Sequence, residues 1–127
     1  MHKRKRGNYW ETYAADYLLK DGYKILFRNW TCRWGEIDLV AEKNGILVFV
    51  EVKFKSSESF GSSWEAVNHW KLVNQVKAMK MFLISEMVGK AYLNGKGSWR
   101  FDVVGITKVA GKVELRHFEA VPLPGLG

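Results

Sequence analysis

The sequence predicts one α/β domain in which helices flank a central mixed sheet. Two segments carry apolar residues at helical spacing: residues 7–20, and a stretch that ends near residue 88. Between them lie two runs rich in β-branched residues, joined by an Asn-Gly pair that strongly favours a hairpin. The predicted order is α-β-β-β-α-β-β. Residues 1–127 suffice for a single domain with a core and are too few for two.

The first helix is expected over residues 7–20, with one apolar stripe formed by Trp10, Tyr13, Ala14, Tyr17 and Leu18. Glu11 borders that stripe, and by itself it is typical of a first-turn glutamate that complements the helix dipole. Residues 1–6 are expected to form a flexible basic arm. Its charges suit contacts with phosphates, and the alternative is a solubilising terminus; they come from Lys3, Arg4, Lys5 and Arg6.

The hairpin is expected from residues 36–41 and 46–53. If Asn44-Gly45 forms a two-residue turn, Asp38 lies opposite Glu51 and Glu36 lies opposite Lys53. Side chains alternate along a strand, so these four polar residues share one face. The other face is apolar and is expected to pack on the core.

Two opposed carboxylates repel each other by about 3 kcal/mol at an effective dielectric constant near 20. A bound divalent cation would reverse that sign, which makes Asp38 and Glu51 candidate metal ligands. The alternative is a solvated ladder in which Lys53 neutralises Glu36 and Asp38. A one-residue slip in register would move one strand's charges to the other face.

The flanking elements are less distinctive. A strand is expected over residues 23–30 and a turn over 31–35, where Gly35 would let backbone or ligand approach closely. A helix is expected to start at a capping box over residues 62–65, or at Asn68, and to end at Gly89. The rest is predicted as a mobile loop (90–98), a strand (99–107), an Ala110-Gly111 turn and a last strand (112–120).

Composition narrows the function classes. The net charge of +7 suits a polyanionic partner. Cys32 is the only cysteine and the three histidines are scattered, so the sequence lacks zinc-ligand spacing, and oxygen ligands point to Mg²⁺ or Mn²⁺. The sequence has neither an apolar run of membrane-spanning length nor the apolar core of a signal peptide, so no membrane partner and a cytoplasmic location are expected.

These residues also resemble a known pattern. Asp38 followed by Glu51-Val52-Lys53 is similar to the PD-(D/E)XK signature of restriction-endonuclease-like nucleases, and with Glu11 it resembles the archaeal Holliday junction resolvases. The YraN-like family of uncharacterised bacterial proteins is closer still, over roughly residues 7 to 107. The segments that carry the resemblance are Glu11 with Ala14-Ala15-Asp16-Tyr17-Leu18, Gly22-Tyr23, Arg28-Asn29-Trp30, Gly35-Glu36-Ile37-Asp38-Leu39, Val48-Phe49-Val50-Glu51-Val52-Lys53, Phe60-Gly61, Glu65-Ala66-Val67 and Arg100-Phe101-Asp102-Val103.

The resemblance implies a restriction-endonuclease-like sheet and a Mg²⁺ or Mn²⁺ site made by Glu11, Asp38 and Glu51, with the Val52 carbonyl as a further ligand and Lys53 beside it. Lys55 stands where an arginine is frequent in this family, and lysine lacks the bidentate geometry of arginine. The candidate nucleic-acid contacts are Lys55, Lys71, Gln75 and the basic arm.

The resulting hypothesis is a metal-dependent nuclease of resolvase type, with Glu11, Asp38, Glu51 and Lys53 as catalytic residues. DNA is expected as substrate ahead of RNA, and resolvase-like symmetry would suit a homodimer. The first alternative is a nucleic-acid-binding module that keeps the nuclease fold without turnover. The second is a hydrolase of small phosphate esters. Asp102 is expected to be structural and paired with Arg100, and Trp34 and Trp99 are expected in the core.

Overall fold

The computed structural model describes residues 2–56 and 69–124, and the side chains of residues 9–56 and 71–124. A five-stranded sheet with the strand order β1-β2-β3-β4-β5 forms its centre. Parallel pairing joins β3 to β4, and the other neighbours are antiparallel, so the sheet is mixed as predicted. The bounds of the strands are β1 Lys24–Cys32, β2 Gly35–Lys43, β3 Ile46–Lys55, β4 Ser98–Val109 and β5 Lys112–Phe118.

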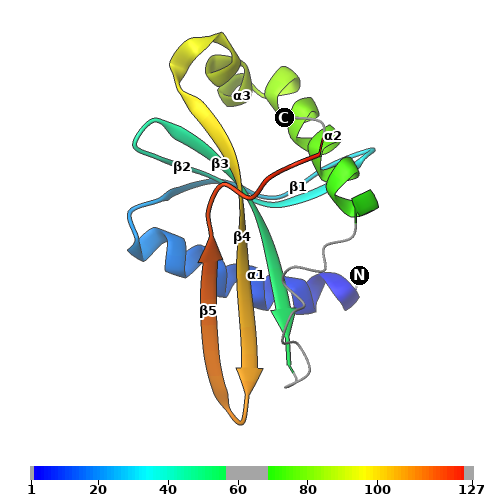
Figure 1. The fold of residues 1–127 in the computed structure, drawn as a ribbon, viewed down its shortest axis with the longest axis vertical. Coiled ribbons are helices and arrows are strands. Elements are labelled where there is room, and N and C mark those ends of the chain that lie inside the picture. The colour runs from blue at the N-terminus through cyan, green and yellow to red at the C-terminus, as the bar shows by residue number, and fades with distance from the viewer. Residues whose placement is uncertain (1, 57–68, 125–127) are drawn as a thin grey trace.

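Helices cover both faces of this sheet. Helix α1 (His2–Lys20) lies across one face, and α2 (His69–Ser85) packs on the other (Figure 1). Two buried clusters correspond to these faces. Ala14 and Leu18 of α1 belong to one, with Leu39, Ala41, Val48 and Val50 of the sheet. Val76, Met79 and Phe82 of α2 belong to the other, with Val40, Leu47 and Phe49. Side chains that alternate along β2 and β3 therefore contribute to two cores, one on each face of the sheet.

The Asn44-Gly45 turn sets the register of the central hairpin as predicted. Both residues have positive φ, 53° and 75°, as a tight hairpin turn requires. Lys43 pairs with Ile46, and the pairing continues to Leu39 with Val50. The predicted pairs Asp38–Glu51 and Glu36–Lys53 are not formed, because the ladder ends before them. Ile37 departs from the expected alternation, because it belongs to the α2-side cluster while Leu39 and Ala41 belong to the α1-side cluster.

Helix α1 begins at His2, ahead of the predicted start at residue 7. Residues 2–6 were expected to be a flexible arm, and their backbone is helical instead. Lysine and arginine are good helix formers, and the single Gly7 costs about 1 kcal/mol, which a long helix tolerates. The side chains of Lys3, Arg4, Lys5 and Arg6 lie outside the described residues, so their phosphate contacts stay a prediction.

The segment after α2 is helical, whereas the sequence predicted a loop over residues 90–98. A short helix α3 (Met87–Ala91) and a π-helical turn η2 (Tyr92–Lys96) lead into β4. Gly89 lies inside α3 and does not end a helix. A Cβ atom on Gly89 would lie 2.5 Å from the carbonyl oxygen of Phe82, so glycine serves here for close backbone packing.

The remaining boundaries move by a few residues. Strand β1 extends to Cys32, which shortens the predicted turn before β2. The capping box over residues 62–65 and Asn68 lie outside the described residues. Every described helix is too short or too polar to cross a bilayer.

Candidate functional site

The predicted site lies where β2 and β3 stop pairing with each other. The ladder between them ends at Leu39 and Val50, although β2 continues to pair with β1 and β3 continues to pair with β4. Asp38 stands just past this point, and its Oδ2 atom accepts a hydrogen bond of 2.8 Å from the backbone N–H of Val52. The separation of the two strands therefore opens the sheet between β2 and β3 at the predicted acidic residues.

Three carboxylates from two elements converge at this opening. Glu11 of α1, Glu36 and Asp38 of β2 each offer an oxygen atom, and these atoms all lie within 4.8 Å of one another. Glu11 is buried, and its Oε1 atom has no hydrogen-bond partner among the described residues. Carboxylate oxygens at this spacing, one of them buried and unpaired, fit a hard divalent cation such as Mg²⁺ or Mn²⁺.

The electrostatics of the group are unfavourable without a cation. Burial, followed by the charge of Glu51, raises the pKa of Asp38 to about 8. Burial and the charge of Glu36 raise the pKa of Glu11, and burial also raises the pKa of Glu51 despite Lys71 and Lys53. Raised carboxyl pKa values in a cleft are typical of functional sites. Protons or a cation are needed to balance these charges.

Glu51 lies in the same cleft and has a different immediate partner. Its Oε2 atom lies 3.7 Å from the Nζ atom of Lys71 on α2. The charge of Glu51 still acts on Asp38, as the raised pKa of Asp38 shows. The structure thus groups Glu36 with Glu11 and Asp38, where the sequence predicted Glu51 as the third ligand. Glu36 is two positions from Asp38 on the predicted polar face, and that spacing was the available signal.

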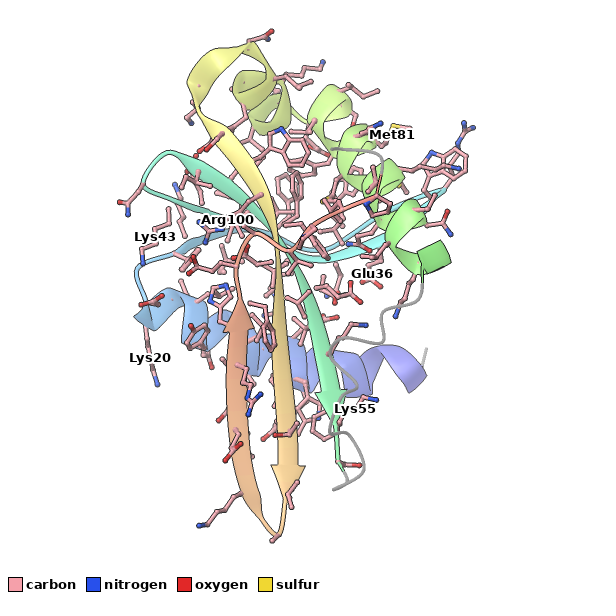
Figure 2. The ribbon with its side chains drawn as sticks, in the orientation of Figure 1. Lys20, Glu36, Lys43, Lys55, Met81 and Arg100 are labelled. Atoms are coloured by element: carbon pink, nitrogen blue, oxygen red, sulfur yellow. The ribbon has the colours of Figure 1, made fainter. Side chains whose placement is uncertain are left out.

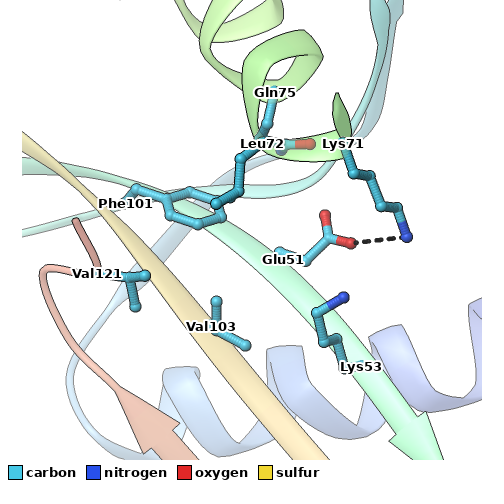
Figure 3. Close-up of a pocket in the computed structure, with 8 residues that line it drawn as sticks. All are labelled: Glu51, Lys53, Lys71, Leu72, Gln75, Phe101, Val103 and Val121. Carbon is cyan, nitrogen blue, oxygen red and sulfur yellow. Dashed lines mark ion pairs between the residues drawn. The ribbon is translucent and has the colours of Figure 1, made fainter. Parts of the chain in front are cut away.

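The cleft has a volume of about 290 Å³, and its lining residues are Trp34, Gly35, Glu36, Asp38, Glu51, Lys71, Asn74 and Gln75. A smaller neighbouring pocket is lined in part by Glu51 and Lys53 of β3 and by Lys71 and Gln75 of α2 (Figure 3). One wall of the site is therefore acidic, while the side toward α2 carries hydrogen-bond donors.

Lys53 is half-buried beside the carboxylates. Burial lowers its pKa, which Glu51 partly offsets. Among the described residues, no ion pair within 4.0 Å joins Lys53 to Glu36 or Asp38. The direct contacts of the charge ladder are therefore not formed, although the charges of Glu51 and Asp38 still raise the pKa of Lys53 against burial.

The other predicted residues differ in how close they lie to the carboxylates. Lys55 is the last residue of β3 and lies away from Glu36 (Figure 2). Val52 contacts the site through its N–H, and a role for its carbonyl stays a prediction. Gly35 has a φ of 143°, and no described protein atom lies within 4 Å of the place its Cβ would take, so the expected approach of backbone is not observed, while the approach of a ligand stays a prediction.

Asp102 has the structural role that the sequence predicted. It is fully buried and accepts hydrogen bonds from Arg100 at 2.9 and 3.1 Å. His117 lies 2.7 Å from it, and the backbone N–H of Ala120 donates a further bond of 3.0 Å. Trp34 and Trp99 are only partly buried at the margin of the α2-side core.

Asn29 is a neighbour of the site that the sequence did not single out for a role. Its side-chain hydrogen bond lowers the pKa of Glu11 against the larger effect of burial. Its φ is 55°, a left-handed conformation that asparagine tolerates better than most residues. The only available signal was its place in the Arg28-Asn29-Trp30 segment.

Comparison with known proteins gives one consistent result. The pattern of the uncharacterised protein family UPF0102 matches residues 10–106. A UPF0102 protein of Carboxydothermus hydrogenoformans is 39% identical over 121 residues, which is 95% of this chain and 98% of the relative. One from Syntrophomonas wolfei is 44% identical over 114 residues, which is 90% of this chain and 94% of the relative. The matched range includes Glu11, Glu36, Asp38, Glu51 and Lys53.

Proposed function

This chain belongs to the uncharacterised UPF0102 (YraN-like) family, and on the chemistry of its cleft we propose that it is a divalent-metal-dependent nuclease that hydrolyses nucleic-acid phosphodiesters. The observation that carries the proposal is the group formed by Glu11, Glu36 and Asp38, whose oxygens lie within 4.8 Å of one another. Without a cation, the charge of this group has to be reduced by protonation, in keeping with the raised pKa values of Glu11 and Asp38.

The residues that would hold the cation are Glu11, Glu36 and Asp38, with Glu51 as a further carboxylate of the same cleft. When bound, Mg²⁺ or Mn²⁺ would polarise a phosphoryl oxygen and lower the pKa of a water molecule. The hydrogen bond from the Val52 N–H fixes the orientation of the Asp38 carboxylate. The buried position of Glu11 excludes water from one side of the group.

Lys53 would stabilise the negative charge that builds up on the phosphate during hydrolysis. It lies on the same strand as Glu51, and its partial burial strengthens its interaction with an anion. Lys71 is largely exposed at the edge of the cleft, with its Nζ atom near Glu51, and would contact an adjacent phosphate. Such contacts lower the energy of the transition state only if they strengthen as charge develops.

A nucleic acid fits the cleft and the chain's charge better than a small phosphate ester. The net charge of +7 attracts a polyanion over a large surface. Gly35 and Asn74 are exposed at the border of the cleft, which supports a ligand that extends beyond it. DNA is the proposed substrate class, with branched DNA as the form to test first.

The decisive experiment is cleavage of labelled duplex, single-stranded, flap and four-way-junction DNA, with RNA counterparts, in Mg²⁺ or Mn²⁺. We expect cleavage that chelator abolishes and that Asp38→Asn reduces at least 100-fold. Glu114→Gln, at an exposed position on β5, is the matched control and should cleave normally. Cleavage that survives in Asp38→Asn or in chelator would refute the assignment.

Binding to these substrates without any cleavage would favour the alternative, a nucleic-acid-binding module with a nuclease fold. In that case the affinity should fall steeply with salt and should persist in chelator, because phosphate contacts and not the cation would hold the strand.

A further inference from the structure

Gln75 has a property that the proposed mechanism does not use. Its side chain comes from α2, is only 8% exposed and lines the cleft with Glu36, Asp38 and Glu51. Its amide nitrogen, Nε2, is buried and has no hydrogen-bond partner among the described residues. Folded proteins pair the great majority of such donors, so an unpaired one beside a cleft indicates a partner other than the described residues.

The surroundings of Gln75 restrict what that partner is. Lys53 and Lys71 line the smaller pocket with it, together with Glu51, which is paired with Lys71 (Figure 3). The carboxylates of Glu11, Glu36 and Asp38 gather as a separate group. A cation would not accept a hydrogen bond from an amide N–H, and an apolar ligand would leave it unpaired. An acceptor oxygen satisfies it, and Lys53 and Lys71 in the same pocket favour one that carries negative charge.

Glutamine also suits this position better than another basic residue would. An amide N–H donates to an anionic oxygen without adding a full positive charge that would repel a cation held by the carboxylates. The acidic group and the donor group are therefore compatible with a ligand that presents a cation-binding oxygen on one side and a second anionic oxygen on the other. A phosphodiester has two such non-bridging oxygens.

We propose that Gln75 is a substrate-binding residue whose Nε2 donates a hydrogen bond to a non-bridging phosphate oxygen of a nucleic-acid strand in the cleft. That the ligand is a nucleic acid rests on the proposed function. The unpaired Nε2 atom is an observation that does not depend on that function. The contact would fix the strand against α2 and would contribute to binding even without a cation.

The test is direct binding of fluorescein-labelled duplex DNA and a labelled four-way junction, measured by anisotropy in chelator. Gln75→Met keeps a side chain of similar length and removes the donor. We expect about 10- to 100-fold weaker binding, as for loss of one hydrogen bond to a charged group. Gln75→Glu should bind at least as weakly, because its carboxylate would repel the phosphate. Ser85→Ala, on α2 at the exposed far end, is the control.

Thermal unfolding separates this contact from a structural role. Because Gln75→Met removes an unpaired buried donor, its Tm should equal or exceed that of the wild type. A lowered Tm would show that the amide has a partner within the chain and would overturn the proposal. Wild-type affinity in Gln75→Met would also overturn it, as would a wild-type protein that binds neither DNA.

The outcome stays distinct from that of the nuclease proposal. A wild-type protein that binds DNA but never cleaves it would refute the nuclease, while the anisotropy of Gln75→Met would still decide the contact. If cleavage occurs, Gln75→Met should raise KM more than it lowers kcat, since it removes a contact made in the ground state.

Discussion

The Oδ2 atom of Asp38 on β2 accepts a 2.8 Å hydrogen bond from the backbone N–H of Val52 on β3. This bond lies just past the last residue pair of the ladder between the two strands. The side chain thus takes a backbone donor at the place where β2 and β3 separate. The same carboxyl group carries a pKa of about 8, because burial and Glu51 oppose its charge. The hydrogen bond that Asp38 accepts therefore stabilises the folded state, whereas the negative charge of its ionised carboxylate destabilises it.

The two roles of Asp38 can be separated by substitution. Asp38→Asn keeps an oxygen that can accept from Val52 and removes the charge, so in chelator at pH 8 it should be more stable than the wild type by about 1–3 kcal/mol. Asp38→Ala loses the acceptor too and should be less stable than Asp38→Asn by about 1 kcal/mol. Urea unfolding of the three proteins measures both differences. A wild type that is the most stable of the three would contradict the account.

The stability of the metal-free protein should fall as the pH rises. The pKa of Asp38 is about 8 in the folded state and 3.8 is its ordinary value, so between these values the folded state binds more protons than the unfolded state. This stabilising contribution is complete below pH 4 and is lost as the pH rises through 8. The pKa values of Glu11 and Glu51 shift in the same direction. Unfolding in chelator across this range should show a smaller slope for Asp38→Asn, and equal slopes would contradict the assignment.

Glu36 should matter for cation binding as much as Asp38 does. Its oxygen lies within 4.8 Å of those of Glu11 and Asp38, so Glu36→Gln weakens the charge that holds a cation. Mg²⁺ should raise the Tm of the wild type and should raise that of Glu36→Gln much less, with at least a tenfold weaker apparent affinity. The exposed Glu114 again provides a control, as Glu114→Gln. An unchanged Mg²⁺ response in Glu36→Gln would remove Glu36 from the cation site.

Asp102 should contribute to stability and not to cation binding. Burial alone would raise its pKa, but the hydrogen bonds from His117, Arg100 and Ala120 hold the pKa below its ordinary value. Its contribution is therefore lost as the pH falls, which is opposite in sign to that of Asp38. Asp102→Asn should cost at least about 2 kcal/mol, because Arg100 and His117 lose a buried charged partner. Calorimetry with and without Mg²⁺ should show a lowered Tm and an unchanged Mg²⁺ increment.

Gly89 tests the packing that the structure reveals between α2 and α3. A glycine-to-alanine change in an exposed helix stabilises a protein by up to about 1 kcal/mol. At Gly89 the new Cβ would lie 2.5 Å from the Phe82 oxygen and 2.7 Å from the Leu83 Cα atom, so Gly89→Ala should instead destabilise by about 1–3 kcal/mol. Lys90→Ala, at the exposed neighbouring position, should have little effect. Stabilisation by Gly89→Ala would show that the two segments do not pack this closely.

Much of the fold could be predicted because its signals are local. The Asn44-Gly45 turn set the hairpin register, since a tight turn that needs positive φ at both positions leaves few alternatives. Alternation along the two strands predicted one apolar face on a core, and the structure has a buried cluster on each side of the sheet. Local signals failed at Gly89, where a residue that usually ends a helix is needed for close packing instead.

The sequence by itself determined the order of the elements, the register of the central hairpin and the presence of Asp38, Glu51 and Lys53 along two neighbouring strands. Only the tertiary structure decided which charges meet. It brought Glu11 and Glu36 to Asp38 and placed Glu51 beside Lys71, and it left the Gln75 Nε2 atom without a partner among the described residues. The register of the hairpin follows from the local conformation of a two-residue turn. Which side chains contact one another depends on how α1 and α2 pack on a twisted sheet.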